Sequence, residues 1–139
     1  MKTITLSNQK GGVAKTSTSN ALSAGLYNRG YKVLAVDLDP QCNLSFSCGE
    51  DMINTEKTLY DVFKGNAEVQ EAIIPLKQGF DLLPGGLTLA GADMDFTQTG
   101  REYMLVEALE KVSDKYDYCI IDTPPTLGIL TANALAAAN

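Results

Sequence analysis

Short apolar runs alternate with longer stretches of helical spacing along most of this 139-residue chain. The apolar runs, rich in β-branched and aliphatic residues, cover 2–7, 32–37, 80–83 and 116–122. Helical spacing covers 16–28, 58–64, 101–113 and 126–138. Strands separated by helices predict βαβ units and a parallel sheet with helices on both faces, because a parallel crossover needs room for a helix. The sequence therefore predicts an α/β fold.

Composition excludes several classes of protein. The chain has 11 basic and 17 acidic residues, a net charge of −6, and 45% hydrophobic residues, which is typical of one folded domain. No stretch approaches the roughly 20 apolar residues of a membrane span, and no apolar leader opens the chain, so we expect a cytoplasmic protein without a membrane partner. The chain has no histidine and no CxxC pair, which excludes histidine-based catalysis and zinc chemistry, and no basic run indicates nucleic acid.

A glycine-containing loop lies between the first strand and the first helix. Residues 10–17 read Lys-Gly-Gly-Val-Ala-Lys-Thr-Ser. Gly11 and Gly12 lack a Cβ, so the backbone can curl and direct its N–H groups inward toward a polyphosphate. The helix N-terminus adds a positive end at the same point. Lys15 can reach the β- and γ-phosphates, and the Thr16 hydroxyl can ligate Mg²⁺.

The loop departs from the strict phosphate-loop pattern G-x-x-x-x-G-K-[ST]. The two glycine positions are occupied by Gln9 and Ala14. Alanine fits where φ is negative and is strained where φ is positive, so we expect a negative φ at Ala14. Gly12→Ala should then be far more harmful than Ala14→Gly.

Acidic residues stand at the ends of two further strands. Asp37 and Asp39 close the second strand, and Asp122 closes the run 116–122. Ligands of such sheets bind beyond the carboxyl ends of the strands, where these side chains should meet the glycine loop. A purely structural interpretation stays open: Asp37 and Asp39 as turn formers before Pro40, and Asp122 as the start of an Asx turn.

The loop KGGxxK[ST], with an extra lysine at its start, resembles the deviant Walker A motif of the ParA/Soj partition ATPases, a family of P-loop NTPases. Three further segments are similar to the family's motifs: VDLDPQCN at 36–43, LLPGGLTLAGA at 82–92 and IIDTPPTLGILTAN at 120–133. The resemblance implies a slow, partner-stimulated ATPase that uses ATP and Mg²⁺. It also implies that the nucleotide is bound by residues of the loop, namely Lys10, Gly11, Gly12, Val13, Ala14, Lys15, Thr16 and Ser17.

The same resemblance implies roles for single residues. Lys10 would reach the partner's phosphates in an ATP-bound homodimer, and Lys10, Lys15 and Asp39 would form the catalytic set. Asp39 would orient and polarise the attacking water. Thr16 would ligate Mg²⁺ directly, while Asp122 and Asp37 would act through water.

The family continues well beyond Asn139, so the resemblance implies that residues 1–139 are the N-terminal part of a single nucleotide-binding domain. The later segments would supply adenine contacts and nonspecific DNA binding on the nucleoid, and a ParB-type protein would stimulate hydrolysis. One edge of the strand 3–6 would then be open.

Two other functions remain open. One is a nucleotide-binding module without turnover, and the other is a Min-type division-site ATPase, which needs an amphipathic membrane helix. A dehydrogenase is disfavoured because no G-x-G-x-x-G follows the first strand.

Overall fold

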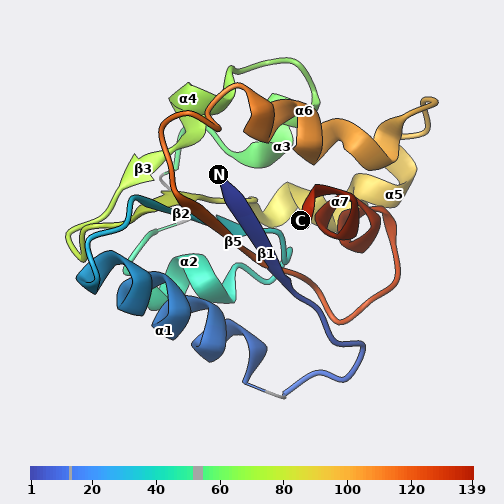
Figure 1. The fold of residues 1–139 in the computed structure, drawn as a ribbon. Helices are drawn as coiled ribbons and strands as arrows, with labels where there is room; N and C mark the ends of the chain where they lie inside the picture. Colours follow the sequence, from blue (N-terminus) through green and yellow to red (C-terminus); the bar gives the residue numbers. More distant parts are fainter. Residues whose placement is uncertain (13, 52–54) are drawn as a thin grey trace.

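Five strands form one sheet in the order β1-β5-β2-β4-β3 in a computed structural model that describes residues 1–12, 14–51 and 55–139 (Figure 1). The strands are β1 (Lys2–Leu6), β2 (Val33–Asp37), β3 (Ile74–Pro75), β4 (Asp81–Leu83) and β5 (Tyr118–Asp122). The pairs β1·β5, β5·β2 and β2·β4 are parallel, which confirms the predicted α/β fold. Only β3 departs, because a tight turn joins it antiparallel to β4 and leaves no room for a crossover.

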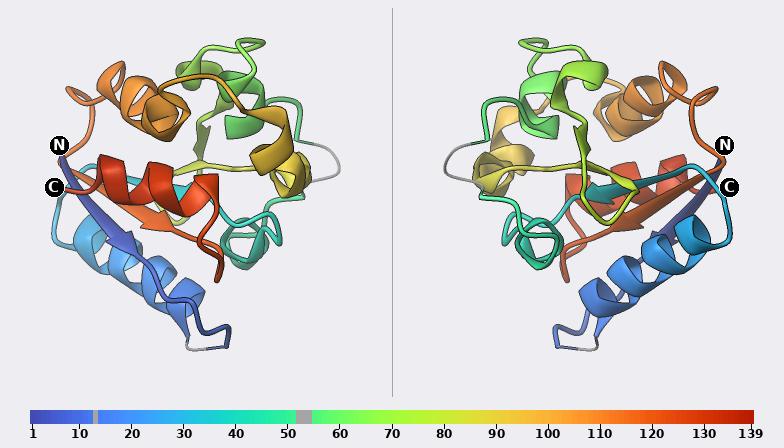
Figure 2. Two further views of the ribbon diagram at one scale, coloured as in Figure 1. Left: turned by 90° about the vertical axis from the view of Figure 1, so that its right-hand side faces the viewer. Right: turned by 90° about the vertical axis from the view of Figure 1, so that its left-hand side faces the viewer.

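Helices cover both faces of the sheet, as predicted (Figures 1 and 2). One face carries α1 (Lys15–Asn28) and α2 (Asn43–Ser47). The opposite face carries α3 (Leu59–Phe63), α4 (Val69–Ala72), α5 (Ala92–Asp95), α6 (Met104–Glu110) and α7 (Ile129–Ala137), with 3₁₀ turns at Leu87–Gly91 and Arg101–Tyr103. The molecule is therefore a three-layer α/β/α arrangement.

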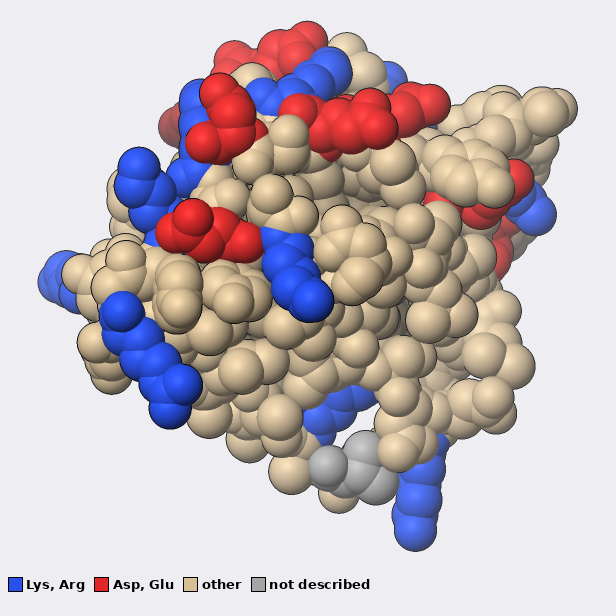
Figure 3. All heavy atoms as spheres, viewed as in Figure 1, with Lys and Arg blue, Asp and Glu red and all other residues tan. Residues whose placement is uncertain are grey.

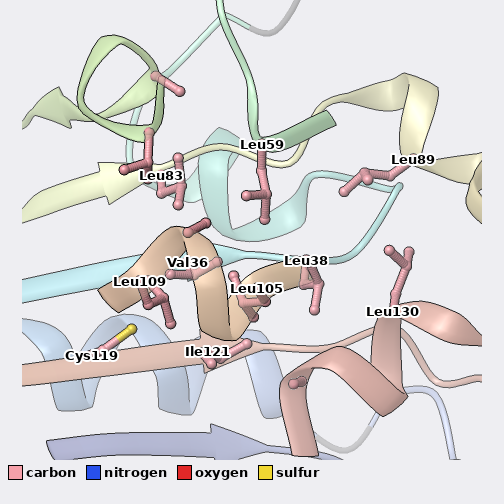
Figure 4. Close-up of a cluster of buried hydrophobic side chains, with 14 of the residues drawn as sticks. Val36, Leu38, Leu59, Leu83, Leu89, Leu105, Leu109, Cys119, Ile121 and Leu130 are labelled. Atoms are coloured by element: carbon pink, nitrogen blue, oxygen red, sulfur yellow. The ribbon is translucent and has the colours of Figure 1, made fainter. Parts of the chain in front are cut away.

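The core is divided by the sheet into two clusters. Alternate residues of β2 and β5 point to opposite faces, so Val36 and Ile121 join the cluster under α6 and α7 (Figure 4), while Ala35 and Ile120 join the cluster against α1 and α2. Both strands are buried on both faces, which explains why their sequences are continuously apolar instead of alternating.

Several boundaries differ from the sequence-based expectation. The predicted helix over 101–113 divides into a 3₁₀ turn and α6, and the predicted helix over 126–138 begins only at Ile129. Short helices α2, α4 and α5 were not expected, because four or five residues carry too little periodicity to reveal them. The helix expected over 58–64 is confirmed as α3, with a capping box in which the Thr58 N–H donates to Asp61 Oδ2 at 2.9 Å.

The strand β1 lies at the edge of the sheet, as expected. Its Thr3 carbonyl accepts a hydrogen bond from the Asn139 N–H, and the Thr3 N–H donates to Asn139 Oδ1 at 2.9 Å. The two termini therefore lie side by side (Figure 2). Within the described residues, no helix has the length and apolarity to cross a bilayer.

Candidate nucleotide-binding site

The parallel register places three strand ends at one point. Asp122 at the end of β5 pairs with Leu6 on one side and with Asp37 on the other. The loop after β1 and the two acidic strand ends therefore converge, as the sequence predicted. Sequence order alone separates them by up to 116 residues (122 − 6), so the sheet is what makes them neighbours.

Two described residues of the glycine loop adopt the left-handed backbone conformation. Gly12 has φ of 72° and Ala14 has φ of 60°. The expectation of a negative φ at Ala14 is therefore wrong: this residue precedes α1 as its N-cap and turns the chain into the helix. Val13, also predicted to bind nucleotide, lies outside the described residues. Turns of this kind beside a helix N-terminus can form the concave arrangements of backbone N–H groups that bind anions.

A cleft of about 310 Å³ opens at this loop. A Cβ built on Gly11 or Gly12 would meet no atom within 4 Å, so the loop encloses space instead of packing against its neighbours. The cleft brings together residues of the loop with three from the segment after β2 and one from the loop after β5: Lys10, Gly11, Gly12, Ala14, Lys15, Thr16, Ser17, Asp39, Gln41, Asn43 and Pro125. The predicted site residues did not include Gln41, Asn43 and Pro125, although all three lie in the segments 36–43 and 120–133 that carry the family resemblance.

The charge around the loop suits an anion. The first acidic residue of the chain is Asp37, so every charged side chain in the glycine loop and in α1 is basic. In Figure 3 the lower part of the molecule, over α1 and the loop after β1, shows Lys and Arg without Asp or Glu, while acidic side chains gather in the upper part. Two ammonium groups and the N-terminus of α1 therefore face the cleft.

Asp122 is held by the first turn of α1. Its Oδ2 accepts a hydrogen bond from the Thr16 hydroxyl at 2.6 Å, and its Oδ1 accepts one from the Ser19 hydroxyl at 3.1 Å. Burial raises the pKa of this carboxyl, while the bond from Thr16 and the charge of Lys15 oppose the rise. Asp122 does not itself line the cleft and reaches it through Thr16. Ser19 was not predicted, although it lies one helical turn after Lys15.

Asp37, like Asp122, is fully buried. Its Oδ2 accepts bonds from the Ser45 N–H at 2.8 Å and the Ser45 hydroxyl at 2.6 Å, and its Oδ1 accepts one from the Asp39 N–H at 3.3 Å. Burial is the main reason that the pKa of Asp37 rises from 3.8 to about 6, against the lowering effect of Ser45. Asp37 is not among the lining residues, so any role toward a ligand is indirect.

Asp39 lines the cleft directly. Its Oδ1 accepts a hydrogen bond from the Gln41 N–H at 2.9 Å, so Asp39 does form the Asx turn that the structural interpretation allowed. In the described part of the chain, no protein group donates to its Oδ2. One carboxylate oxygen therefore fixes the turn, and the other has no protein donor among the described residues.

A larger cavity of about 630 Å³ lies at the opposite, amino end of the strands, and its walls include Tyr27, Tyr31, Lys32 and Tyr116. It adjoins the C-terminal end of α1, where the helix dipole is negative. Triphosphate therefore fits the smaller cleft better than the larger cavity.

Oxygen donors around Thr16 suit a hard cation. Mg²⁺ is usually held by one or two protein oxygens together with substrate phosphates. Among residues 1–12, 14–51 and 55–139, no group of three or more acidic or cysteine side chains forms a cage for a metal alone. The donor set present, a hydroxyl backed by a carboxylate at 2.6 Å, fits a metal that arrives with a nucleotide.

Comparison with known proteins agrees with this geometry. The sporulation initiation inhibitor protein Soj of Bacillus subtilis is 44% identical over 99% of this chain and 55% of its own length. The chromosome partitioning protein ParA of Caulobacter vibrioides is 39% identical over 100% of this chain and 54% of its own. A structure of cobyrinic acid a,c-diamide synthase from Mycobacterium smegmatis with a bound ATP analogue and magnesium superposes with a TM-score of 0.96, at 44% identity, over 99% of this chain and 55% of that one.

The chain spans about half the length of these relatives. A family model described as an AAA domain matches residues 1–139 from end to end. The chain therefore belongs to this AAA domain family, and its relatives include the Soj and ParA partition ATPases.

Proposed function

We propose that this chain binds ATP with Mg²⁺ in the cleft at the glycine loop and forms the nucleotide-binding part of a partition ATPase. The observation that carries the proposal is the Thr16–Asp122 hydrogen bond of 2.6 Å at the N-terminus of α1, directly beside Lys15 and an open glycine loop. A positive helix end, a lysine and a carboxylate-backed hydroxyl are the parts that a metal–triphosphate complex requires. The relatives named above support the same assignment.

The loop residues and the two buried carboxylates behind the cleft have distinct roles in this proposal. The N–H groups of the loop surround the phosphates, and Lys15 neutralises the charge that develops on the transferred phosphoryl group. Thr16 would ligate Mg²⁺, while Asp122, held by Ser19, would orient the Thr16 hydroxyl and support the metal through water. When bound, Mg²⁺ supplies charge neutralisation between the phosphates. Asp37 supports this arrangement from the interior by fixing the turn that carries Asp39.

Asp39 is the residue proposed to act on water. Asp39 lines the cleft and its Oδ2 has no protein donor among the described residues, so this oxygen can accept a hydrogen bond from a water molecule and orient that water for attack on the terminal phosphorus. Hydrolysis is then mostly positioning and electrostatics, which needs no histidine. Lys10, exposed on the rim of the cleft, is proposed to reach the phosphates bound by a second copy.

The biological setting follows from the relatives. We propose that ATP brings two chains into a homodimer, that nonspecific DNA binds through segments beyond Asn139, and that a ParB-type protein stimulates hydrolysis. The protein would act in the cytoplasm on the nucleoid, without a membrane partner. Residues 1–139 would be the N-terminal part of one domain, which explains why the relatives are about twice as long.

A second candidate function has a specific observation in its favour. The diamide synthase structure from M. smegmatis is as identical to this chain as Soj is, at 44%. Amide synthesis and partition can share an ATP-binding half, so the assays must separate them. Turnover that depends on DNA and a ParB-type protein supports partition, and turnover that depends on a carboxylic acid and an amine donor supports synthesis.

The decisive experiment pairs binding with turnover for Asp39→Ala. Calorimetric titration with ATP and Mg²⁺ should give the same affinity for the parent and the variant. Phosphate release, measured in the chain extended to the length of its relatives with DNA and a ParB-type protein present, should be lost in the variant. Unchanged turnover would remove Asp39 from the mechanism, and a parent without affinity for ATP would overturn the function. Binding without any turnover in the extended parent would leave a nucleotide-binding module.

A further inference from the structure

The loop that follows Asp122 is held at both ends by groups from other elements. At its start, the Thr123 hydroxyl donates to the Leu6 carbonyl at 2.8 Å. At its end, the Ile129 N–H, the first of α7, donates to Asp93 Oδ1 at 2.9 Å. Between these points lies Pro125, which lines the nucleotide cleft. The position of the Asp93 carboxylate therefore bears on one wall of that cleft.

The N-terminus of α7 has no cap of its own. Its N-cap residue is Gly128, which carries no side chain and forms no side-chain cap hydrogen bond. Asp93, on α5, supplies the missing acceptor from a different element, and its negative charge also complements the positive helix end. In Figure 1, α5 lies beside α7 at the side of the molecule to which this loop returns.

The space at Gly128 is filled by the same carboxylate. A Cβ built on Gly128 would lie 2.5 Å from Asp93 Oδ2 and 3.0 Å from Oδ1. The φ of Gly128 is −84°, so backbone conformation does not require glycine here. What requires glycine is the close approach of Asp93.

We propose that Asp93 is a positioning residue that anchors the loop 123–128 and thereby sets the wall of the nucleotide cleft formed by Pro125. The expected effect of Asp93 on ATP binding rests on the proposed function. Its expected effect on the loop rests only on the hydrogen bonds described above. Loss of the anchor lets the loop occupy other positions, and the apparent affinity is then the intrinsic affinity multiplied by the fraction of molecules in which the loop is correctly placed.

Asp95 provides a matched control on the same helix. It is also an exposed aspartate of α5, and its Oδ2 accepts a hydrogen bond from the Tyr60 hydroxyl at 2.7 Å. Its contact leads to α3 and not to α7. Asp95→Ala therefore removes one hydrogen bond of α5 without touching the anchor.

The test compares Asp93→Ala, Asp93→Asn and Asp95→Ala by amide hydrogen exchange and by titration with ATP and Mg²⁺. We expect Asp93→Ala to speed exchange over residues 123–130 and to weaken ATP binding about three- to tenfold, the size of a lost helix cap. Asp93→Asn should recover most of both effects, because asparagine also accepts a hydrogen bond at an N-cap. Asp95→Ala should change neither.

Two results would overturn the inference. Unchanged exchange over 123–130 in Asp93→Ala would show that the carboxylate does not hold the loop. Faster exchange with parental ATP affinity would show that the anchor is structural and does not reach the cleft. Should the parent itself fail to bind ATP, the proposed function is wrong, and the exchange comparison still decides whether Asp93 holds the loop.

Discussion

The cleft at the carboxyl ends of the strands has about half the volume of the cavity at their amino ends, 310 against 630 Å³. Both contain lysines, and both adjoin an end of α1. They differ in which end of α1 they meet: N–H groups point into the smaller cleft, and carbonyl groups close the helix at the larger cavity. The direction of the backbone, more than available volume, therefore decides where a phosphate binds.

The largest expected effect comes from replacing one lysine at each of the two cavities, which tests the difference between them. Lys15→Ala removes the ammonium at the smaller cleft and should weaken binding of ATP with Mg²⁺ about 100-fold or more, as expected for a lost charge-assisted contact. Lys32→Ala makes the same change at the wall of the larger cavity and should leave affinity unchanged. Calorimetric titration measures both. Equal effects of the two variants would place the nucleotide elsewhere.

The next effect concerns the buried carboxylate at the nucleotide end. Because the pKa of Asp37 rises from 3.8 to about 6 on folding, its contribution to stability is fully present below pH 3.8 and is lost as pH rises through 6. A rise of about two pKa units corresponds to about 3 kcal/mol. Without magnesium, the parent should therefore lose stability between pH 4 and 7, measured by urea unfolding at each pH.

Asp37→Asn should remove the part of that pH dependence that Asp37 contributes, since asparagine does not titrate, and leave the part from Asp122, whose pKa burial also raises. Asp81→Asn, a change of the carboxylate that accepts the Tyr116 hydroxyl at the amino end, should keep the parental dependence. A parental slope in Asp37→Asn would show that another group titrates in this range.

Alanine substitutions at two glycines with positive φ should have a smaller effect and separate backbone strain from loss of ligand binding. Gly12 and Gly30 both have positive φ, 72° and 93°, and a Cβ at either meets no atom within 4 Å. Alanine at each position should cost about 1–2 kcal/mol of stability through backbone strain. Only Gly12→Ala should also weaken ATP binding, because Gly30 lies at the larger cavity. Thermal unfolding and titration together measure the two effects, and parental affinity in Gly12→Ala would exclude the loop as a phosphate cradle.

The smallest effect concerns Ala14, whose φ of 60° strains an alanine. Ala14→Gly should raise the free energy of unfolding by about 0.5–1 kcal/mol, the strain relieved less the extra entropy of the unfolded chain. Ala132→Gly, at an exposed position inside α7, should lower stability by about 1 kcal/mol. Changes of opposite sign in the free energy of unfolding of these two variants would confirm the left-handed turn before α1. A loss of stability in both variants would contradict it.

The fold was largely predictable because its central strands have a clear sequence pattern. The runs ending at Asp37 and Asp122 are continuously apolar, a pattern that follows from burial on both faces of a parallel sheet. The edge pair β3 and β4 was only half predicted. Two residues at Ile74–Pro75 are too few for any periodicity, and their antiparallel direction depends on a turn.

The site was predictable where chemistry is local and unpredictable where it depends on packing. The loop motif itself identifies Lys15 as a phosphate-binding residue and Thr16 as a Mg²⁺ ligand, because the two residues are adjacent in the sequence. Neither Ser45, which holds Asp37 in the interior, nor Asp93, which caps α7, has a signal in its own neighbourhood. The wrong expectation for Ala14 has the same origin, because its φ is set by how the loop must enter α1.

By itself, the sequence determined the order of strands and helices apart from α2, α4, α5 and β3, the glycine loop with its two lysines, and the acidic residues at two strand ends. These depend on side-chain type and on spacing within a few residues, which a chain carries in its unfolded form. Only the tertiary structure decided that Leu6, Asp37 and Asp122 lie in one register, that Ser19 and Thr16 share one carboxylate, and that a residue of α5 caps α7. Such contacts join groups that are far apart in sequence, and they exist only after the sheet and its helices have packed together.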